Sequence, residues 1–195
     1  MDDKDLILLV QQGDEEAFEE IMRKYKNKIV NFLFHLTGDY EKAVEISQET
    51  FIRVYFKANK YRPKAPLSSW IFTIASNLAK TELKKTRKQR YIPLEDVYNH
   101  NQEGLSETDD LERREMAKKM KKALSKLHRR YRIPLVLKDI EGFSQEEISE
   151  ILKKPIGTIK AQISRGRKYL KHEIRKNNFG LDLKTEGQEL GNERV

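Results

Sequence analysis

The chain has 195 residues and a formal net charge of +8 at pH 7, with 37% apolar and 36% charged residues. This length accommodates one or two small domains with hydrophobic cores, and the positive charge suits an anionic partner such as nucleic acid or, alternatively, a solubilising Lys/Glu surface. The absence of cysteine excludes disulfides and cysteine-based zinc sites. The longest early apolar run, residues 6–10, is too short to span a bilayer, so we expect a cytoplasmic protein.

Helical periodicity dominates the first 60 residues. We expect a short helix over residues 2–12 that Gly13 ends. Asp14 then caps a long amphipathic helix, which Gly38 ends in a left-handed conformation. A third helix is expected over residues 40–59.

The third helix has apolar residues on two faces. Its inner stripe consists of Ala43, Ile46, Ser47, Thr50, Val54 and Ala58. The opposite face carries Val44, Glu45, Gln48, Ile52 and Tyr55. Apolar residues on a face expected to be solvated indicate burial against something else, either another helix of the same domain or an external partner.

Two prolines, Pro63 and Pro66, predict a loop over residues 61–66. Ser68 or Ser69 is expected to cap a fourth helix that runs to about residue 90. Six basic residues against one acid give its second half a charge of +5. Aromatic residues followed by a basic helix suit base stacking and phosphate contact. Such aromatic residues are also typical of a helix core, and such basic residues are also typical of a solvated helix end.

Composition changes sharply after Arg90. Residues 91–115 contain eight acids and two bases, a charge of −6, without sustained periodicity. This pattern predicts a flexible acidic linker, which would avoid DNA and follow a basic channel on a protein partner or serve only as a soluble tether.

Helical patterns return from Ala117. Two helices are expected before Gly142, and Ser144 with Glu147 has the spacing of a capping box. Residues 153–157 break the next helix, and Thr158 opens another whose apolar stripe is Ile159, Ile163, Gly166 and Leu170. Basic and polar side chains lie away from that stripe, namely Lys160, Gln162, Arg165 and Lys168. The pattern predicts a helix-turn-helix whose second helix enters the DNA major groove.

No strand alternation competes with these patterns, so the predicted fold class is all-α with two helical domains. The expected division is a first domain over residues 1–90, a linker over 91–115, a helix-turn-helix domain over 116–176 and a flexible tail over 177–195.

Three segments resemble the extracytoplasmic-function sigma factors of bacterial RNA polymerase, the small group that keeps only regions 2 and 4. They are QETFIRVY at residues 48–55, SSWIFTIASNLAKTELKK at 68–85 and LVLKDIEGFSQEEISEILKKPIGTIKAQISRGRKYL at 135–170. The resemblance covers roughly residues 14–90 and 115–175. It implies that region 2 binds the polymerase and the promoter −10 element, while region 4 binds the −35 element.

The resemblance also implies site residues. Those that bind the polymerase clamp helices are Val44, Glu45, Gln48, Glu49, Ile52 and Tyr55. The loop over residues 60–68 resembles the element that captures a flipped −10 base, and the −10 contacts are Tyr61, Asn77, Lys80, Lys84 and Arg87. The −35 contacts are Thr158, Lys160, Ala161, Gln162, Arg165 and Lys168.

Other partners follow from the same resemblance. The linker would thread the RNA-exit and active-site channel of core RNA polymerase, whose flap is a further partner. An anti-sigma factor, often membrane-bound, is also implied, whereas no cofactor, metal or small-molecule substrate is expected.

Several residues depart from the family pattern. Relatives often carry an acidic pair at Val44 and Glu45, an Arg at Ser76 and an Asp at Thr81. Ala161 and Gln162 replace a frequent Ser-Arg pair, which leaves the −35 base preference open. Ala161 offers only apolar contact, for instance to a thymine methyl group, whereas Gln162 is able to pair with adenine.

Two other function classes compete. An autonomous helix-turn-helix regulator would bind duplex DNA without polymerase. An enzyme would need a catalytic motif, but the four histidines are scattered and no Gly-rich phosphate loop or paired-acid motif occurs.

Overall fold

The computed structural model describes residues 1–89 and 119–186, with side chains over 1–85 and 119–176, and its regular structure in these ranges is entirely helical. The expectation of an all-α chain is therefore confirmed. The predicted linker over residues 91–115 lies outside the described residues. The helices are α1 (Asp3–Gln11), α2 (Glu15–Thr37), α3 (Tyr40–Phe56), a short 3-10 turn (Ala58–Lys60), α4 (Leu67–Gln89), an unlabelled helix over residues 119–126, α6 (Arg129–Asp139), α7 (Gln145–Leu152) and α8 (Ile156–Glu186).

Short acidic side chains begin the first three helices. The Oδ1 atoms of Asp2, Asp14 and Asp39 accept hydrogen bonds from backbone N–H groups in the first turns of α1, α2 and α3. Gly38 ends α2 in the left-handed conformation at φ 76°, and its N–H donates to the carbonyl of Phe34 at 2.8 Å. The predicted caps at Asp14 and Gly38 are confirmed.

Two boundaries in this half differ from the prediction. Helix α3 ends at Phe56, and the expected last turn is instead the 3-10 turn. Helix α4 begins at Leu67, so neither Ser68 nor Ser69 caps it; the carbonyl of Pro66 accepts from the N–H of Trp70 at 3.3 Å. The fixed φ of proline suits a helix start, so Pro66 makes a serine cap unnecessary.

The second half contains the helix-turn-helix. The capping box is present: the N–H of Ser144 donates to Oε2 of Glu147 at 2.8 Å, and the N–H of Glu147 donates to Oγ of Ser144 at 3.1 Å. Lys153 ends α7 in the left-handed conformation at φ 53°. Helix α8 begins at Ile156 rather than Thr158, because the carbonyl of Pro155 already accepts from the next turn.

Part of the segment expected to be a flexible tail is helical. Helix α8 passes Lys176 and continues to Glu186. No proline follows Pro155, so the sequence contains no residue that lacks a backbone donor over this stretch.

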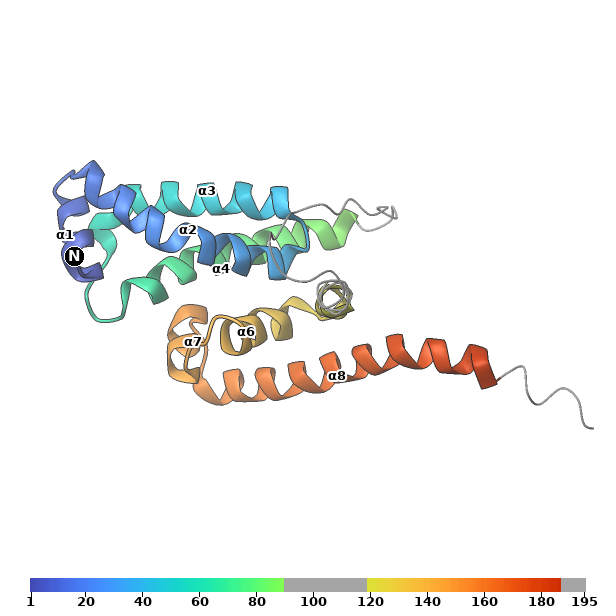
Figure 1. The fold of residues 1–195 in the computed structure, drawn as a ribbon. Helices are drawn as coiled ribbons and strands as arrows, with labels where there is room; N and C mark the ends of the chain where they lie inside the picture. The colour runs from blue at the N-terminus through green and yellow to red at the C-terminus, as the bar shows by residue number, and fades with distance from the viewer. Residues whose placement is uncertain (90–118, 187–195) are drawn as a thin grey trace, which may run out of the picture.

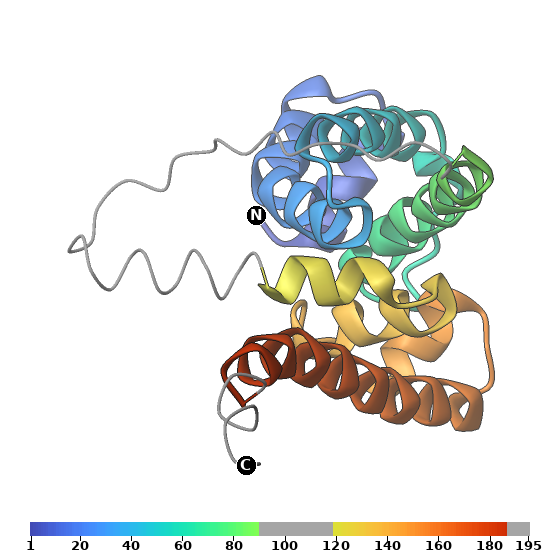
Figure 2. The same cartoon turned by 90° about the vertical axis from the view of Figure 1, so that its right-hand side faces the viewer.

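The two halves lie against each other. Figures 1 and 2 show α2, α3 and α4 on one side and α6, α7 and α8 on the other. Helix α7 packs on α4, and α6 packs on α2. The buried apolar residues of both halves form one continuous cluster. We call residues 1–89 the N-terminal half and residues 119–186 the C-terminal half.

Candidate nucleic-acid and protein interfaces

The outer face of α3 is exposed in this structure. The inner stripe from Ala43 to Ala58 is buried as predicted, whereas Glu45 and Gln48 are exposed and Val44, Glu49 and Tyr55 are half-buried. Ile52 retains 51% of its accessible surface. Within the described residues no other helix covers Ile52, which disfavours the explanation that this side chain packs inside its own domain.

Phe56 extends this face and was missed by the sequence reasoning. It is 78% exposed, the most exposed large apolar side chain within the described residues. Its ring contacts Tyr55 at 5.6 Å between centroids, and Tyr55 contacts Phe18 at 5.0 Å. Phe56 follows Ile52 by four residues, so helical spacing alone places both on one face. We define the α3 surface as Val44, Glu45, Gln48, Glu49, Ile52, Tyr55 and Phe56.

The loop before α4 is held by Tyr61. This residue is only 6% exposed, its hydroxyl donates to the carbonyl of Ala65 at 2.8 Å, and its ring lies 5.4 Å from that of Trp70. Tyr61 therefore shapes the loop, and its ring does not face solvent. Trp70 is half-buried against it, as expected of an aromatic residue that packs in the core of its helix.

Helix α4 carries the predicted −10 contacts on a basic face. Asn77 and Lys84 are exposed, while Lys80 is half-buried and donates from Nζ to Oδ1 of Asn77 at 3.1 Å. Burial lowers the pKa of Lys80, and the nearby charge of Lys154 lowers it further. The side chain of Arg87 lies outside those described. The structure thus brings Asn77, Lys80 and Lys84 together along one helix.

Helix α8 presents most of the predicted −35 contacts to solvent. Ile159 and Ile163 are buried in the core, whereas the exposed residues are Thr158, Lys160, Ala161, Arg165 and Lys168. Gln162 differs: it is 6% exposed, and its Oε1 accepts from Nζ of Lys154 at 3.3 Å. In this conformation the Gln162 amide is directed toward the turn between α7 and α8.

Helix α8 is fixed on α6 by close contacts. A Cβ at Gly166 would lie 3.4 Å from the carbonyl oxygen of Tyr131, so glycine permits this approach of the two helices. Arg167 makes two hydrogen bonds to the carboxylate of Asp139, one of 2.9 Å from Nε. These contacts hold the exposed side of the second helix in a defined orientation, as a helix that enters a groove requires.

Residues 1–89 and 119–186 contain no group of three or more His, Asp or Glu side chains placed to hold a metal ion. Within the same ranges, no helix has both the length and the apolar character needed to cross a bilayer.

Comparisons with known proteins agree with this arrangement. Residues 21–89 match the family model of Sigma-70 region 2, and residues 117–170 match that of Sigma-70, region 4. The chain is 32% identical over 180 residues to the ECF RNA polymerase sigma factor SigW of Bacillus subtilis, covering 88% of this chain and 96% of that protein. It is 30% identical over 175 residues to the RNA polymerase sigma-H factor of Pseudomonas aeruginosa, covering 85% and 90%.

Solved structures have the same fold. CnrH in complex with the cytosolic domain of CnrY superposes with a TM-score of 0.68 at 20% identity, over 89% of this chain and 97% of that one. The sigma factor RpoE in complex with the anti-sigma factor NepR from Bartonella quintana gives a TM-score of 0.64 at 25% identity, over 82% and 98%. On the two region matches and the identity to SigW, the chain belongs to the ECF RNA polymerase sigma factors.

Proposed function

We propose that this sigma factor binds core RNA polymerase and directs initiation at promoters, with α4 at the −10 element and α8 at the −35 element. The observation that carries the proposal is the pairing of region 2 and region 4 in one chain with an exposed polar or basic face on each. Phosphate contacts position the protein, while base contacts give the sequence preference.

The α3 surface is the proposed site for the polymerase clamp. It combines exposed apolar groups, Ile52 and Phe56, with the polar side chains Glu45, Gln48 and Glu49. Exposed apolar groups surrounded by polar ones are typical of protein-binding surfaces. Val44 and Tyr55 are half-buried and border the surface.

Helix α4 and the loop before it are the proposed −10 site. Asn77 contacts the unpaired strand, and Lys80, Lys84 and Arg87 neutralise phosphates. Extruding a base costs a few kcal/mol, which contacts to the extruded base offset. Tyr61 supports the loop from inside, so its part in −10 binding is to hold the loop that receives the base.

Helix α8 is the proposed −35 reader. Arg165 and Lys160 are long exposed cations suited to guanine or phosphate, and Ala161 offers apolar contact to a thymine methyl group. Thr158 and Lys168 border this face. Gln162 pairs with adenine only after its amide leaves Lys154, so that contact requires a change of side-chain conformation.

Two further partners belong to this proposal. The acidic linker over residues 91–115 passes through the RNA-exit and active-site channel of the polymerase. An anti-sigma factor holds the chain inactive, at the membrane if that partner is anchored there; the structural similarity to a sigma factor in complex with the anti-sigma factor NepR supports this partner.

In vitro transcription with purified core polymerase on a promoter library tests the proposal. We expect start sites that require the chain and share two upstream elements. A gel shift with and without core polymerase tests the autonomous regulator, which no comparison favours. Tight duplex binding by the chain alone, without promoter-dependent initiation, would contradict the proposal.

A further inference from the structure

We propose that Lys154, in the turn between α7 and α8, determines which −35 bases the chain distinguishes, because its ammonium group holds the amide of Gln162 away from the DNA major groove. Lys154 acts through Gln162 and is therefore a positioning residue. This role rests on the proposed function of α8 as the −35 reader, and it adds the residue that sets one of its base preferences.

The backbone of Lys154 is fixed on both sides. Its N–H donates to the carbonyl of Ser149 at 3.1 Å, and its carbonyl accepts from Oγ of Ser149 at 2.5 Å. Lys153, just before it, has the left-handed conformation at φ 53°. Pro155, just after it, has a restricted φ and disfavours the helical conformation for Lys154. The side chain of Lys154 therefore leaves the turn from a defined point.

The ammonium group of Lys154 has an amide as its partner. Nζ donates to Oε1 of Gln162 at 3.3 Å. Among the described residues no ion pair includes Lys154, and the charges that act on it are those of two other cations, Arg130 and Lys80. Lys154 is half-buried, so it has lost part of its hydration, and the bond to an oxygen offsets that loss. Moving Gln162 away would leave a half-buried cation without this bond.

Gln162 lies at the border between the buried and the exposed face of α8. Three residues before it Ile159 is buried, and three residues after it Arg165 is exposed. Residues three apart are neighbours on a helix surface, so a side chain at this border is able to turn either way by rotation of its own bonds. The hydrogen bond to Lys154 selects the inward direction, which leaves Gln162 6% exposed.

Two contacts compete for the same oxygen atom. A glutamine that reads adenine accepts from the adenine amino group through Oε1 and donates to N7 through Nε2. In this structure Oε1 of Gln162 already accepts from Lys154. A hydrogen bond to a charged group and a two-bond base contact have stabilities of the same order, so the gain at adenine is largely offset by the loss of the Lys154 bond. The parent should therefore show little preference at the base pair that Gln162 faces.

Transcription from a promoter library tests this role in the full chain. Core polymerase and the chain initiate on promoters with randomised −35 bases and a fixed −10 element, and sequencing of the transcripts gives the preference at each position. Lys154→Met keeps a long side chain but removes the donor, so it should raise the preference for adenine at one −35 position about tenfold. Lys154→Arg keeps a cationic donor and should retain the preferences of the parent.

Two controls separate this contact from a general effect on the turn. Lys153→Met removes the charge of the neighbouring exposed lysine and should leave every base preference unchanged. Gln162→Ala, added to Lys154→Met, should abolish the new preference because the amide that reads the base is gone. Unchanged preferences in Lys154→Met would overturn the role of Lys154. So would the same gain in Lys153→Met or Lys154→Arg, or a gain that survives the loss of Gln162.

Nuclear magnetic resonance measures the contact without polymerase or DNA. In the isotope-labelled free chain, the side-chain amide resonances of Gln162 are assigned by their absence in Gln162→Ala. They should shift in Lys154→Met and stay in place in Lys153→Met. A promoter library that depends on the −35 bases, with amide resonances that ignore Lys154, would overturn this role and leave the proposed function standing. Amide resonances that respond, with initiation indifferent to every −35 base, would instead contradict the proposed function and with it the role of Lys154.

Discussion

Arg165 is the exposed side chain on which promoter preference should depend most directly. Its guanidinium group projects from α8 without an ion-pair partner among the described residues. Arg165→Ala should weaken −35-dependent initiation by about 1–3 kcal/mol if the group meets a base. Transcription from promoters with and without a −35 element measures this loss. Ser164→Ala, at the neighbouring exposed position, is the control; equal effects of both variants would contradict a specific role.

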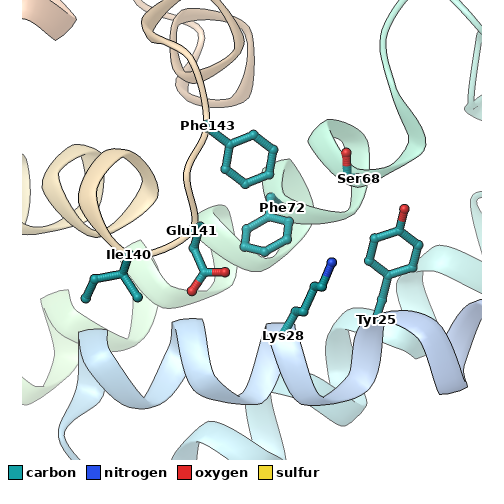
Figure 3. A pocket seen from close by; sticks show the side chains of 7 residues that line it. All are labelled: Tyr25, Lys28, Ser68, Phe72, Ile140, Glu141 and Phe143. Carbon is teal, nitrogen blue, oxygen red and sulfur yellow. The ribbon is translucent and has the colours of Figure 1, made fainter.

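Glu141 gives the chain a pH-dependent stability. Burial raises the pKa of its carboxyl group from 4.5 to about 7, although Lys28 acts in the opposite direction. The folded protein therefore binds this proton more tightly than the unfolded chain. The free energy of unfolding should fall as pH rises from about 4.5 to 7 on this account. Glu141 lines a pocket together with two other titratable side chains, Lys28 and Tyr25 (Figure 3), and burial raises the pKa of Tyr25 further from neutrality.

Urea unfolding of the parent and of Glu141→Gln between pH 5 and 8 measures the contribution of Glu141 to the free energy of unfolding. The variant should lack the decrease that Glu141 causes, so its free energy of unfolding relative to that of the parent should grow with pH. Burial lowers the pKa of His35, which instead removes stability as pH falls below its usual 6.5. His35 is common to both proteins, so the comparison cancels it. A constant difference across the range would contradict the assignment to Glu141.

Individual residues were partly predictable. Ile159 and Ile163 follow from helical spacing, because periodicity reports which side chains face the core. Tyr61 and Gln162 were expected to face DNA but are buried. Their burial depends on Trp70 and Lys154, contacts made by a loop and a turn whose course periodicity does not specify.

Among the elements, α7 depends on its capping box. Ser144→Ala removes one acceptor for the N–H groups of the first turn and should destabilise the protein by about 1 kcal/mol. Equilibrium unfolding in urea measures this change. Ser164→Ala within α8 should be neutral or slightly stabilising, since alanine favours a helix interior. A Ser144→Ala protein as stable as the parent would show that the capping box is not needed for α7.

Helix α3 carries its function on an exposed face. Ile52→Glu should reduce affinity for core polymerase at least tenfold, about 1.4 kcal/mol, because it puts a charge in the proposed apolar contact. Leu8→Glu alters a 41% exposed apolar residue of α1 and is the matched control. Both variants should have nearly the same urea midpoint of unfolding as the parent. The affinity of each fluorescently labelled variant for core polymerase is then measured by titration. Equal affinities for the two variants would exclude α3 as the binding site.

Helix existence was predictable, whereas helix boundaries were less so. The caps at Asp14, Gly38 and Ser144 are local signals that tertiary structure did not override. The starts of α4 and α8 lie two or three residues before the expected positions, because Pro66 and Pro155 supply the first carbonyl acceptors. The serine and threonine residues after these prolines are the more obvious cap candidates in the sequence, but the helices begin directly after the prolines.

At the scale of the whole molecule, the two helical regions and their order were predictable from motifs. Their mutual packing was not. It depends on Arg132 reaching the carbonyl of Leu36 and on Phe143 reaching Phe72, pairs far apart in the chain with no periodic signature. The structure therefore adds the packing of the two halves to a function that the sequence already indicated.

Spacer length tests the central claim most directly, that one chain binds two promoter elements which the polymerase holds apart. Runoff transcription with core polymerase should proceed from a cognate promoter. It should fail when about five base pairs, half a helical turn, are inserted between the −35 and −10 elements. The binding of the chain to core polymerase should be unchanged, because the insertion alters only the DNA. Initiation that is indifferent to this insertion, with both elements intact, would contradict the account.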